Sequence, residues 1–486
     1  MPQLTMTYDG VSRATDAEID LAGLAMPAPG AFSAMIARPQ IFRVAMLALG
    51  DIVHSNFEVL DKEEWRARVL DPVVGIHPDG VSFEAFSQDG SALGWVHFAN
   101  TVFEEPDVRR GGCTSIDYSD KLEKCFRAIA PASRMRLRIG SAEGVRLEQG
   151  KKTHHEKKID LPDGWLRGFG ELHAGLLQAS VTVPLSKADL FNILRAVKGR
   201  APGMRGRGVV FDIQPGERVV VHVEPWDTII RLQSPPPDVD EPISYKIYGR
   251  RRLSLLENLI PHVDSARLHL CGSSRPSYWE LMMPGARMIL AMSSWTARKF
   301  TKSFTESLRG AAAPIDDATL QRAAAFLADA ELVSLDELAE GLGISADQAK
   351  GVALALCRQG LAIAEPESRG LRWRPLRYLP FAEVCGAGEL SSREENAAGL
   401  LEAGKLEVLS SVEREGLRMA SARCEGSAGI YDLKLTLNPD GSFAAAECAC
   451  KWMTKNRNDL RGGPCKHLLA LRSHVLNRAT EENRHA

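Results

Sequence analysis

The feature that most constrains this chain lies near its C-terminal end, where three cysteines and one histidine stand in two closely spaced pairs. Cys448 and Cys450 form the first pair, and Cys465 and His467 form the second. Three thiolates and one imidazole are a complete ligand set for a tetrahedral structural zinc site. Buried cysteine also serves as a small apolar residue, but that alternative does not account for four ligand-type residues in two pairs. The pattern therefore predicts one structural zinc ion.

The local sequence around the pairs predicts how they converge. Residues 444–450 are expected to form a strand, and strand side chains alternate between faces, so Cys448 and Cys450 point the same way. Pro464 breaks the chain, and residues 468–476 are expected to form a helix. Cys465 and His467 would then lie at the turn entering that helix. The polar stretch 451–464 is expected to be a loop that closes over the metal.

Residues 431–438 and 442–450 read as two strands joined by a Pro-Asp-Gly turn, with the metal ligands and a helix after them. This order, a hairpin, a CxC pair, a CxH pair and then a helix, resembles the SWIM-type zinc finger over roughly residues 405–480. We delimit this small ββα zinc module as 391–480. The resemblance implies that the module contacts nucleic acid or protein partners.

The zinc module also carries basic side chains around a tryptophan. Such a surface suits contact with phosphates and stacking on bases, although a solvated loop has the same composition. The formal net charge of the chain is −2, so any attraction to nucleic acid has to come from a local patch of this kind. The candidate contact residues are Lys451, Trp452, Lys455, Arg457, Arg461, Lys466 and Arg472.

Residues 313–380 are expected to form a separate module of three helices and a hairpin. Ser334 and Glu337 have the spacing of a capping box, and Ser345 is placed to cap the next helix. The order of elements resembles a winged helix, in which the helix over 346–359 would read DNA. Its basic face is thin, and the hairpin carries more charge, from Arg369, Arg372, Arg374 and Arg377. Use of the module as a protein contact or spacer stays open.

Residues 1–312 are expected to form an α+β body. A helix over 186–198 is followed by three expected strands, and a helix over 253–261 is followed by three more; residues 41–98 repeat the order in degenerate form. This suggests duplication and resembles the repeated unit of sliding-clamp proteins, although no clamp motif is present and coincidence remains an alternative. Residues 1–40 are expected to be a loosely packed lead-in. The predicted fold class is thus α+β multidomain: a duplicated helix-plus-strands body, a winged helix-like module and the zinc module.

Composition sets wider limits. With 44% hydrophobic and 25% charged residues, the chain is typical of globular proteins. No apolar run is long enough to cross a membrane, and the first twenty residues do not resemble a signal peptide. Nine cysteines without a disulfide framework favour a reducing compartment. We therefore expect a cytoplasmic protein that does not contact membranes.

Catalytic motifs are missing. Gly399, Gly404 and Lys405 match the start of a phosphate-binding loop, but Leu406 stands where a magnesium-binding hydroxyl is needed. A zinc ion with four protein ligands has no open position for water. The sequence therefore predicts a protein that is not an enzyme.

Two functional hypotheses follow. The first is a zinc-binding protein that contacts DNA or RNA through its basic zinc module. The second is a protein-interaction adaptor. Bacterial proteins with a long N-terminal body and a C-terminal SWIM module resemble this chain, and that resemblance implies partnership with an AAA ATPase of the MoxR type and a von Willebrand A-domain protein.

Overall fold

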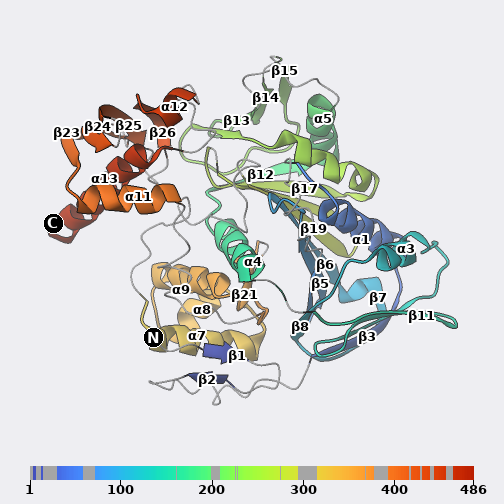
Figure 1. Cartoon of the computed structure of the whole chain (residues 1–486). Helices are drawn as coiled ribbons and strands as arrows, with labels where there is room; N and C mark the ends of the chain where they lie inside the picture. Colours follow the sequence, from blue (N-terminus) through green and yellow to red (C-terminus); the bar gives the residue numbers. More distant parts are fainter. Residues whose placement is uncertain are drawn as a thin grey trace. The chain divides into compact units, whose positions relative to one another are not determined.

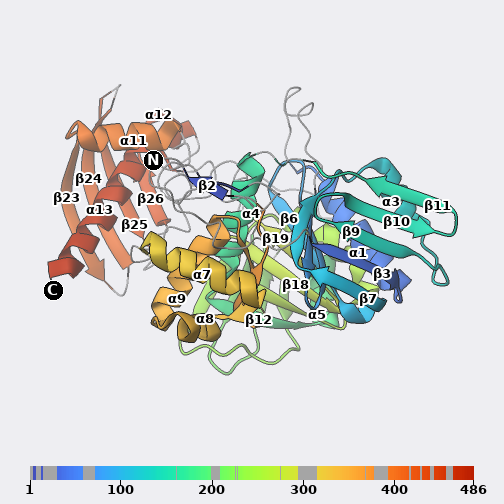
Figure 2. The ribbon, with the colours of Figure 1, turned by 90° about the horizontal axis from the view of Figure 1, so that it is seen from below.

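The computed structural model is a mixed α+β chain that divides into two compact units (Figures 1 and 2). The first unit comprises residues 1–304 and 312–386, and the second comprises 305–311 and 387–486. Residues 313–380, expected to be a separate module, thus fall in the same unit as the body. The structure describes residues 4–6, 12–14, 30–57, 72–159, 161, 163–198, 208–224, 226, 228–273, 275–293, 315–366, 368–376, 392–414, 417–426, 429–437, 443–455 and 464–485.

One order of elements, a strand, a helix and three strands, recurs four times in the described part of the body. The first occurrence is β3 (Ala31–Ile36), α1 (Pro39–Val53), β4 (Val73–His77), β5 (Gly80–Phe86) and β6 (Ala92–Ala99). The second is β8 (Gly112–Ser115), α3 (Asp120–Arg127), β9 (Arg136–Gly140), β10 (Gly144–Gln149) and β11 (Lys152–Glu156). The third is β12 (Val181–Ser186), α5 (Lys187–Val197), β13 (Val209–Ile213), β14 (Val220–Val223) and β15 (Thr228–Arg231). The fourth is β16 (Ile243–Ile247), the 3-10 helix η3 (Arg250–His262), β17 (Ser265–Leu270), β18 (Ser277–Met283) and β19 (Ala286–Met292).

Five further described elements of the body stand outside this order. They are the short pair β1 (Leu4–Met6) and β2 (Ser12–Ala14), the 3-10 turn η2 (Asn100–Val102) with strand β7 (Phe103–Arg110), and helix α4 (Asp163–Leu176). The expectation of a loose lead-in over 1–40 is wrong for β3. Its side chains alternate between buried and half-buried because β3 lies inside a five-stranded sheet, in the order β11-β10-β9-β3-β7.

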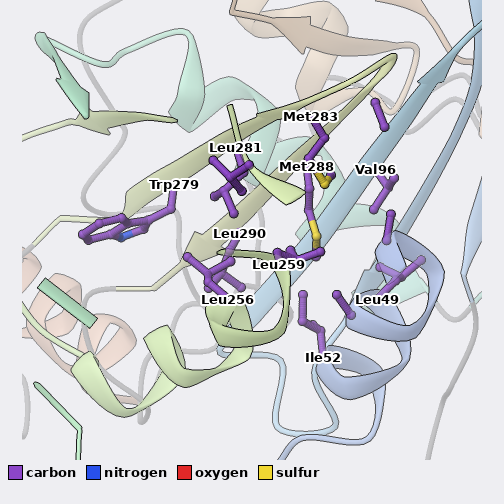
Figure 3. Packing of buried hydrophobic residues seen from close by; sticks show 14 of the residues in the cluster. Leu49, Ile52, Val96, Leu256, Leu259, Trp279, Leu281, Met283, Met288 and Leu290 are labelled. Carbon is purple, nitrogen blue, oxygen red and sulfur yellow. The ribbon is translucent and has the colours of Figure 1, made fainter. Parts of the chain in front are cut away.

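The first two occurrences of this order of a strand, a helix and three strands make up the first half of the body, and the last two make up the second half. An eight-stranded sheet joins the two halves, in the order β12-β17-β18-β19-β6-β5-β4-β8. The seam is the antiparallel pair β6–β19, with Val96 opposite Met288. On one face of this sheet, Leu49 and Ile52 of α1 and Leu256 and Leu259 of η3 belong to one buried apolar cluster with Met288 and Leu290 (Figure 3). Gly94 permits this packing, because a Cβ there would lie 2.6 Å from Ile52 Cδ1.

Residues 315–376 contribute α7 (Asp317–Ala330), β20 (Leu332–Ser334), α8 (Leu335–Leu342), α9 (Ala346–Arg358), β21 (Ala362–Glu365) and β22 (Gly370–Trp373). The capping boxes expected at Ser334 and Ser345 are formed. The strands make a small antiparallel sheet in the order β20-β22-β21. The apolar core of this segment also takes in Ala174 of α4, so α4 packs with the helices of the segment.

The second unit is larger than the expected ββα module. Its elements are α11 (Ser392–Glu402), β23 (Leu406–Arg414), β24 (Leu417–Gly426), β25 (Gly429–Leu437), β26 (Phe443–Cys448), α12 (Lys451–Lys455) and α13 (Lys466–His485). The strands form a four-stranded antiparallel meander. Helix α13 packs against it, and α11 packs against α13 (Figure 2). Ala397 and Leu400 of α11 share one apolar core with Leu433, Leu435 and Leu468.

Candidate metal centre

The four predicted ligands come together where β26 and α13 meet. Cys448 is the last residue of β26 and points to the buried face. The strand ends there, so the expectation of a strand through Cys450 is wrong by two residues: the Cys450 carbonyl instead accepts a hydrogen bond from the Thr454 amide and starts α12. Cys465 likewise precedes α13, because its carbonyl accepts from the Leu469 amide. His467 lies in the first turn of that helix.

The ligand atoms of the four residues lie within 4.8 Å of one another. His467 Nδ1 is 3.8 Å from Cys448 Sγ and 3.7 Å from Cys465 Sγ. Zinc–sulfur and zinc–nitrogen bonds of about 2.3 and 2.0 Å at tetrahedral angles separate such atoms by about 3.5 to 3.8 Å. All four side chains are buried, none more than 4% exposed. The cluster therefore has the donors, spacing and enclosure to hold a metal ion.

The sulfur atoms sit in an environment that favours negative charge at one of them. Hydrogen bonds from the Cys448 thiol, His467 and the Leu468 amide at the start of α13 hold the pKa of Cys465 well below its ordinary value. The same contact with Cys465, together with burial, raises the pKa of Cys448. The Cys450 amide also lies 3.4 Å from Cys448 Sγ. Binding of a divalent cation would release protons from such a cluster, because thiolates are the ligating form.

The far side of the histidine ring meets the β24–β25 hairpin. The rings of His467 and Tyr431 have centroids 4.7 Å apart at 39°. A Cβ built on Gly426 would lie 2.7 Å from His467 Nε2. Cys424 is also buried in this apolar core, but it is not one of the four residues whose ligand atoms converge.

The predicted nucleic-acid contacts are only partly placed by the structure. Lys451 and Trp452 are exposed on α12, with Trp452 41% exposed. Residues 451–464, expected to be all loop, therefore begin with a helical turn. Lys466 and Arg472 are half-buried on α13. Lys455 ends α12 with its side chain undescribed, and Arg457 and Arg461 lie outside the described residues.

The helix that would read DNA in a winged helix is covered over its C-terminal half. Along α9, Val352, Ala353 and Leu356 are buried, and α4 lies against this helix so closely that a Cβ on Gly170 would be 2.7 Å from the Cys357 carbonyl. Arg358 is also buried, 3.7 Å from Glu171 of α4. The N-terminal part of α9, with Asp347, Gln348 and Lys350, is exposed.

The arginines assigned to the hairpin are mostly buried as well. Arg372 is 4% exposed and Arg374 is fully buried, while Arg369 is exposed and Arg377 lies outside the described residues. Arg372 makes a two-pronged pair with Asp79 at 2.5 and 2.7 Å and also contacts Glu365 at 2.6 Å. These side chains are therefore engaged inside the protein, and the expectation that they form a surface for phosphate is wrong.

Arg372 and Arg374 belong to a buried layer of ion pairs, which we call the charged layer. It lies on the face of the eight-stranded sheet opposite to α1 and η3. Glu365 pairs with both oxygens to Arg287 of β19, at 2.5 and 2.6 Å. Arg374 lies 2.7 Å from Glu84, whose other oxygen is 2.9 Å from His173 of α4. Sequence reasoning missed the layer, because its members are scattered single residues from seven elements. The layer consists of Asp79, Glu84, His97, His173, Glu280, Arg287, Glu365, Arg372 and Arg374.

The pKa values in this layer follow from burial and pairing. Burial lowers the pKa of His97 and His173, and that of the neighbouring His77. Burial alone would raise the pKa of Glu365, but Arg287 and Arg372 outweigh it and bring that pKa to about 2. Pairing with arginine thus favours the charged form of Glu365, while burial favours the neutral form of the histidines.

Three stretches of the body are rich in basic residues, at 151–158, 195–207 and 250–252. In the first cluster, residues 152–156 form β11, and His154 pairs with Glu156 at 2.6 Å. Residues 199–207 lie outside the described residues. In the third cluster only Arg251 is exposed, because Arg252 is buried against Ser293 and Arg250 stacks on Trp226, 4.0 Å from the ring centroid.

One other group has metal-type ligands. His54, Asp120 and Glu123 place ligand atoms close together, but Asp120 is exposed and His54 half-exposed. Across the described part of the chain, no helix is both long and apolar enough to cross a membrane.

Comparisons with known proteins add little. No protein-family model matches this chain, and no curated protein matches it. Among solved structures, Proliferating Cellular Nuclear Antigen from Entamoeba histolytica has 12% identity and a TM-score of 0.39, covering 54% of this chain and 98% of that one. A structure of the C-terminal region of FEN-1 bound to A. fulgidus PCNA gives 11% identity and a TM-score of 0.37, covering 54% and 97%. Similarity this low carries no argument about activity or partners.

Proposed function

We propose that the second unit is a SWIM-type zinc module in which one zinc ion plays a structural role. The observation that supports this most is the closed, buried set of three thiols and one Nδ1 within 4.8 Å. Four protein ligands leave zinc no open position for a reacting water, so the site stabilises the fold rather than catalysing a reaction. The cytoplasm, where cysteines stay reduced, is the compartment that suits such a site.

The nucleic-acid function that we propose for the protein rests on α12. This helix starts beside the metal ligands and exposes Lys451 and Trp452 next to each other. A cation beside an exposed indole suits a phosphate and an unstacked base, so single-stranded DNA or RNA is the substrate class that it fits. The exposed part of α9 carries Asp347 close to Lys350, which makes it a poorer surface for phosphates than α12.

A salt titration tests this function. The full chain, loaded with zinc, is titrated against fluorescent single-stranded and duplex DNA and RNA of mixed sequence. Affinity should fall steeply with salt, and Trp452→Ala should weaken single-strand binding by about 1–3 kcal/mol. The matched control is Phe191→Ala, since Phe191 is another exposed aromatic residue, on α5 of the first unit. Absence of binding at low salt to every one of these nucleic acids would contradict the proposal.

A second candidate is a protein-interaction adaptor, and the packing of α4 on α9 supports it. In this chain α4 packs on the C-terminal half of the helix that would read DNA in a winged helix, so we infer that the segment acts as a spacer or protein contact. The partners in that case would be an AAA ATPase of the MoxR type and a von Willebrand A-domain protein. Purification from the native host in buffer without nucleic acid, followed by identification of bound proteins, separates the two candidates.

A further inference from the structure

The imidazole of His467 has a defined orientation in the zinc module. Its Nδ1 faces the sulfur atoms of Cys448 and Cys465 at 3.8 and 3.7 Å. Its Nε2 is buried and has no hydrogen-bond partner among the described residues. Since Nε2 lies toward Gly426 and Nδ1 toward the thiols, the two nitrogens cannot exchange roles without moving the ring.

The end of the β24–β25 hairpin forms the seat of this ring. Tyr431 stands opposite Cys424 and Gly426 opposite Gly429 in the strand register. The Tyr431 ring covers one side of the imidazole, at 4.7 Å between centroids. A side chain on Gly426 would meet both rings, because its Cβ would lie 2.7 Å from His467 Nε2 and 2.7 Å from Tyr431 Cε2. The space at Gly426 is therefore needed for the ring to sit where it does.

The spacing of the second ligand pair requires the nearer nitrogen. Cys465 immediately precedes α13 and His467 is the second residue of the helix. Two ligands this close in sequence converge on one ion only if the reach of the second is short. A cysteine sulfur is one bond from its Cβ. In histidine, Nδ1 is two bonds from Cβ and Nε2 is three bonds away. The hairpin seat and the short spacing thus favour the same nitrogen.

We propose that Tyr431 and Gly426 are positioning residues that fix His467 so that Nδ1, and not Nε2, is the metal donor. The inference rests on the proposed structural zinc site. In the metal-bound form the imidazole is neutral and its proton stays on Nε2, on the Gly426 side. Residues that orient a metal-bound histidine typically change metal affinity 10- to 100-fold when mutated.

Two substitutions of the ligand itself test which nitrogen binds. In His467→Asp a carboxylate oxygen takes the place of Nδ1, and in His467→Glu it reaches the place of Nε2; carboxylates are zinc ligands. Zinc content and affinity are measured on the full chain by metal analysis and chelator competition. We expect His467→Asp to keep one zinc per chain and His467→Glu to bind at least about tenfold more weakly. Equal or reversed affinities would overturn the assignment of Nδ1.

Variants of the seat test its role. We expect Tyr431→Ala and Gly426→Ala to lower zinc affinity about 10- to 100-fold, while Tyr431→Phe, which keeps the ring, stays within about threefold. Cys424→Ala is the matched control, because this buried thiol is next to the site and outside the ligand set. Unchanged affinity in Tyr431→Ala, or a Tyr431→Phe variant as weak as Tyr431→Ala, would overturn the positioning role. A wild-type chain without stoichiometric zinc would instead overturn the proposed function, and this inference with it.

Discussion

The zinc module and the charged layer bury polar groups in opposite ways. The four ligands of the zinc module come from residues 448–467 and need an external ion to neutralise their thiolates. The charged layer brings together residues as far apart as Asp79 and Arg372 and pairs its carboxylates with arginines of the protein itself. The difference indicates where each fold is vulnerable: the second unit depends on one ion, and the first on having every member of a network in place.

The charged layer also acts across the seam of the eight-stranded sheet. Arg372 binds Asp79 in the first half of the body, and Glu365 binds Arg287 of β19 in the second half. Arg372 and Glu365, which both lie in residues 315–376, contact each other at 2.6 Å. Residues 315–376 therefore connect both halves through a chain of pairs, whereas the apolar contacts in Figure 3 connect them on the other face.

The largest effect that we expect is loss of the second unit on removing a metal ligand. Structural zinc contributes about 10–16 kcal/mol of apparent binding energy to small modules. Cys448→Ser should therefore expose the amides of residues 430–476 to hydrogen exchange, while those of 315–376 remain protected. Cys271→Ser, at a buried cysteine of the first unit, is the control. Equal protection of both segments in Cys448→Ser would contradict the dependence on zinc.

The next effect concerns the charged layer. Glu365→Ala leaves Arg287 and Arg372 buried without their shared carboxylate, and breaking such a pair costs about 3–5 kcal/mol. Replacing all three residues by apolar ones of similar size should cost less, because the two arginines are then no longer left without Glu365, although Asp79 loses its pair with Arg372. Urea denaturation, followed through the first unit, gives both values. A triple variant that is less stable than Glu365→Ala would show that the network stabilises the first unit more than its apolar equivalent does.

Acid should weaken the first unit through its buried histidines. The folded pKa values of His77, His97 and His173 are lowered, while unfolded histidine titrates near 6.5. The unfolded chain therefore binds more protons below about pH 6.5, and stability falls as pH drops, by up to about 1.4 kcal/mol per pH unit for each histidine. Denaturation midpoints of zinc-loaded protein between pH 7.5 and 5.5 check the slope.

A variant sharpens the pH experiment. His97→Gln should flatten the slope below pH 6.5, because one buried titrating group is lost. The same slope in wild type and His97→Gln would exclude His97 as a contributor.

The smallest stability effect is expected on α12. Lys451 and Trp452 are exposed, and surface substitutions usually change stability by less than about 0.5 kcal/mol. Lys451→Ala and Trp452→Ala should therefore leave the melting transitions of both units unchanged while lowering affinity for single strands. A substantial loss of stability in either variant would mean that α12 is part of the fold rather than a contact surface.

The sequence predicts the metal cluster well because the information is local. Two ligand pairs, a strand and Pro464 are enough to bring Cys448 and His467 together. The same holds for Ser334 and Ser345, whose caps depend on residues three positions away. The body strands over 73–98 and 265–292 are also predicted, since each is an apolar run bounded by turns.

The charged layer could not be found in this way. Glu84 and His173 are each surrounded by ordinary neighbours, and only the packing of α4 on the sheet brings them to 2.9 Å. Arg372 and Arg374 look like solvent-facing charges in a hairpin, yet carboxylates far along the chain bury them. Sequence patterns report the period of an element, but not which distant element will cover its polar side.

The antiparallel seam between β6 and β19 has a consequence during synthesis. Val96 pairs with Met288, so β6 cannot form this pair until Met288 has been synthesised. At about 5–20 residues per second, the roughly 190 residues between them take about 10–40 s to synthesise. Throughout that interval the growing polypeptide displays a long apolar strand with open backbone groups. We therefore expect the yield of folded protein in cells to rise when a chaperone shields that edge.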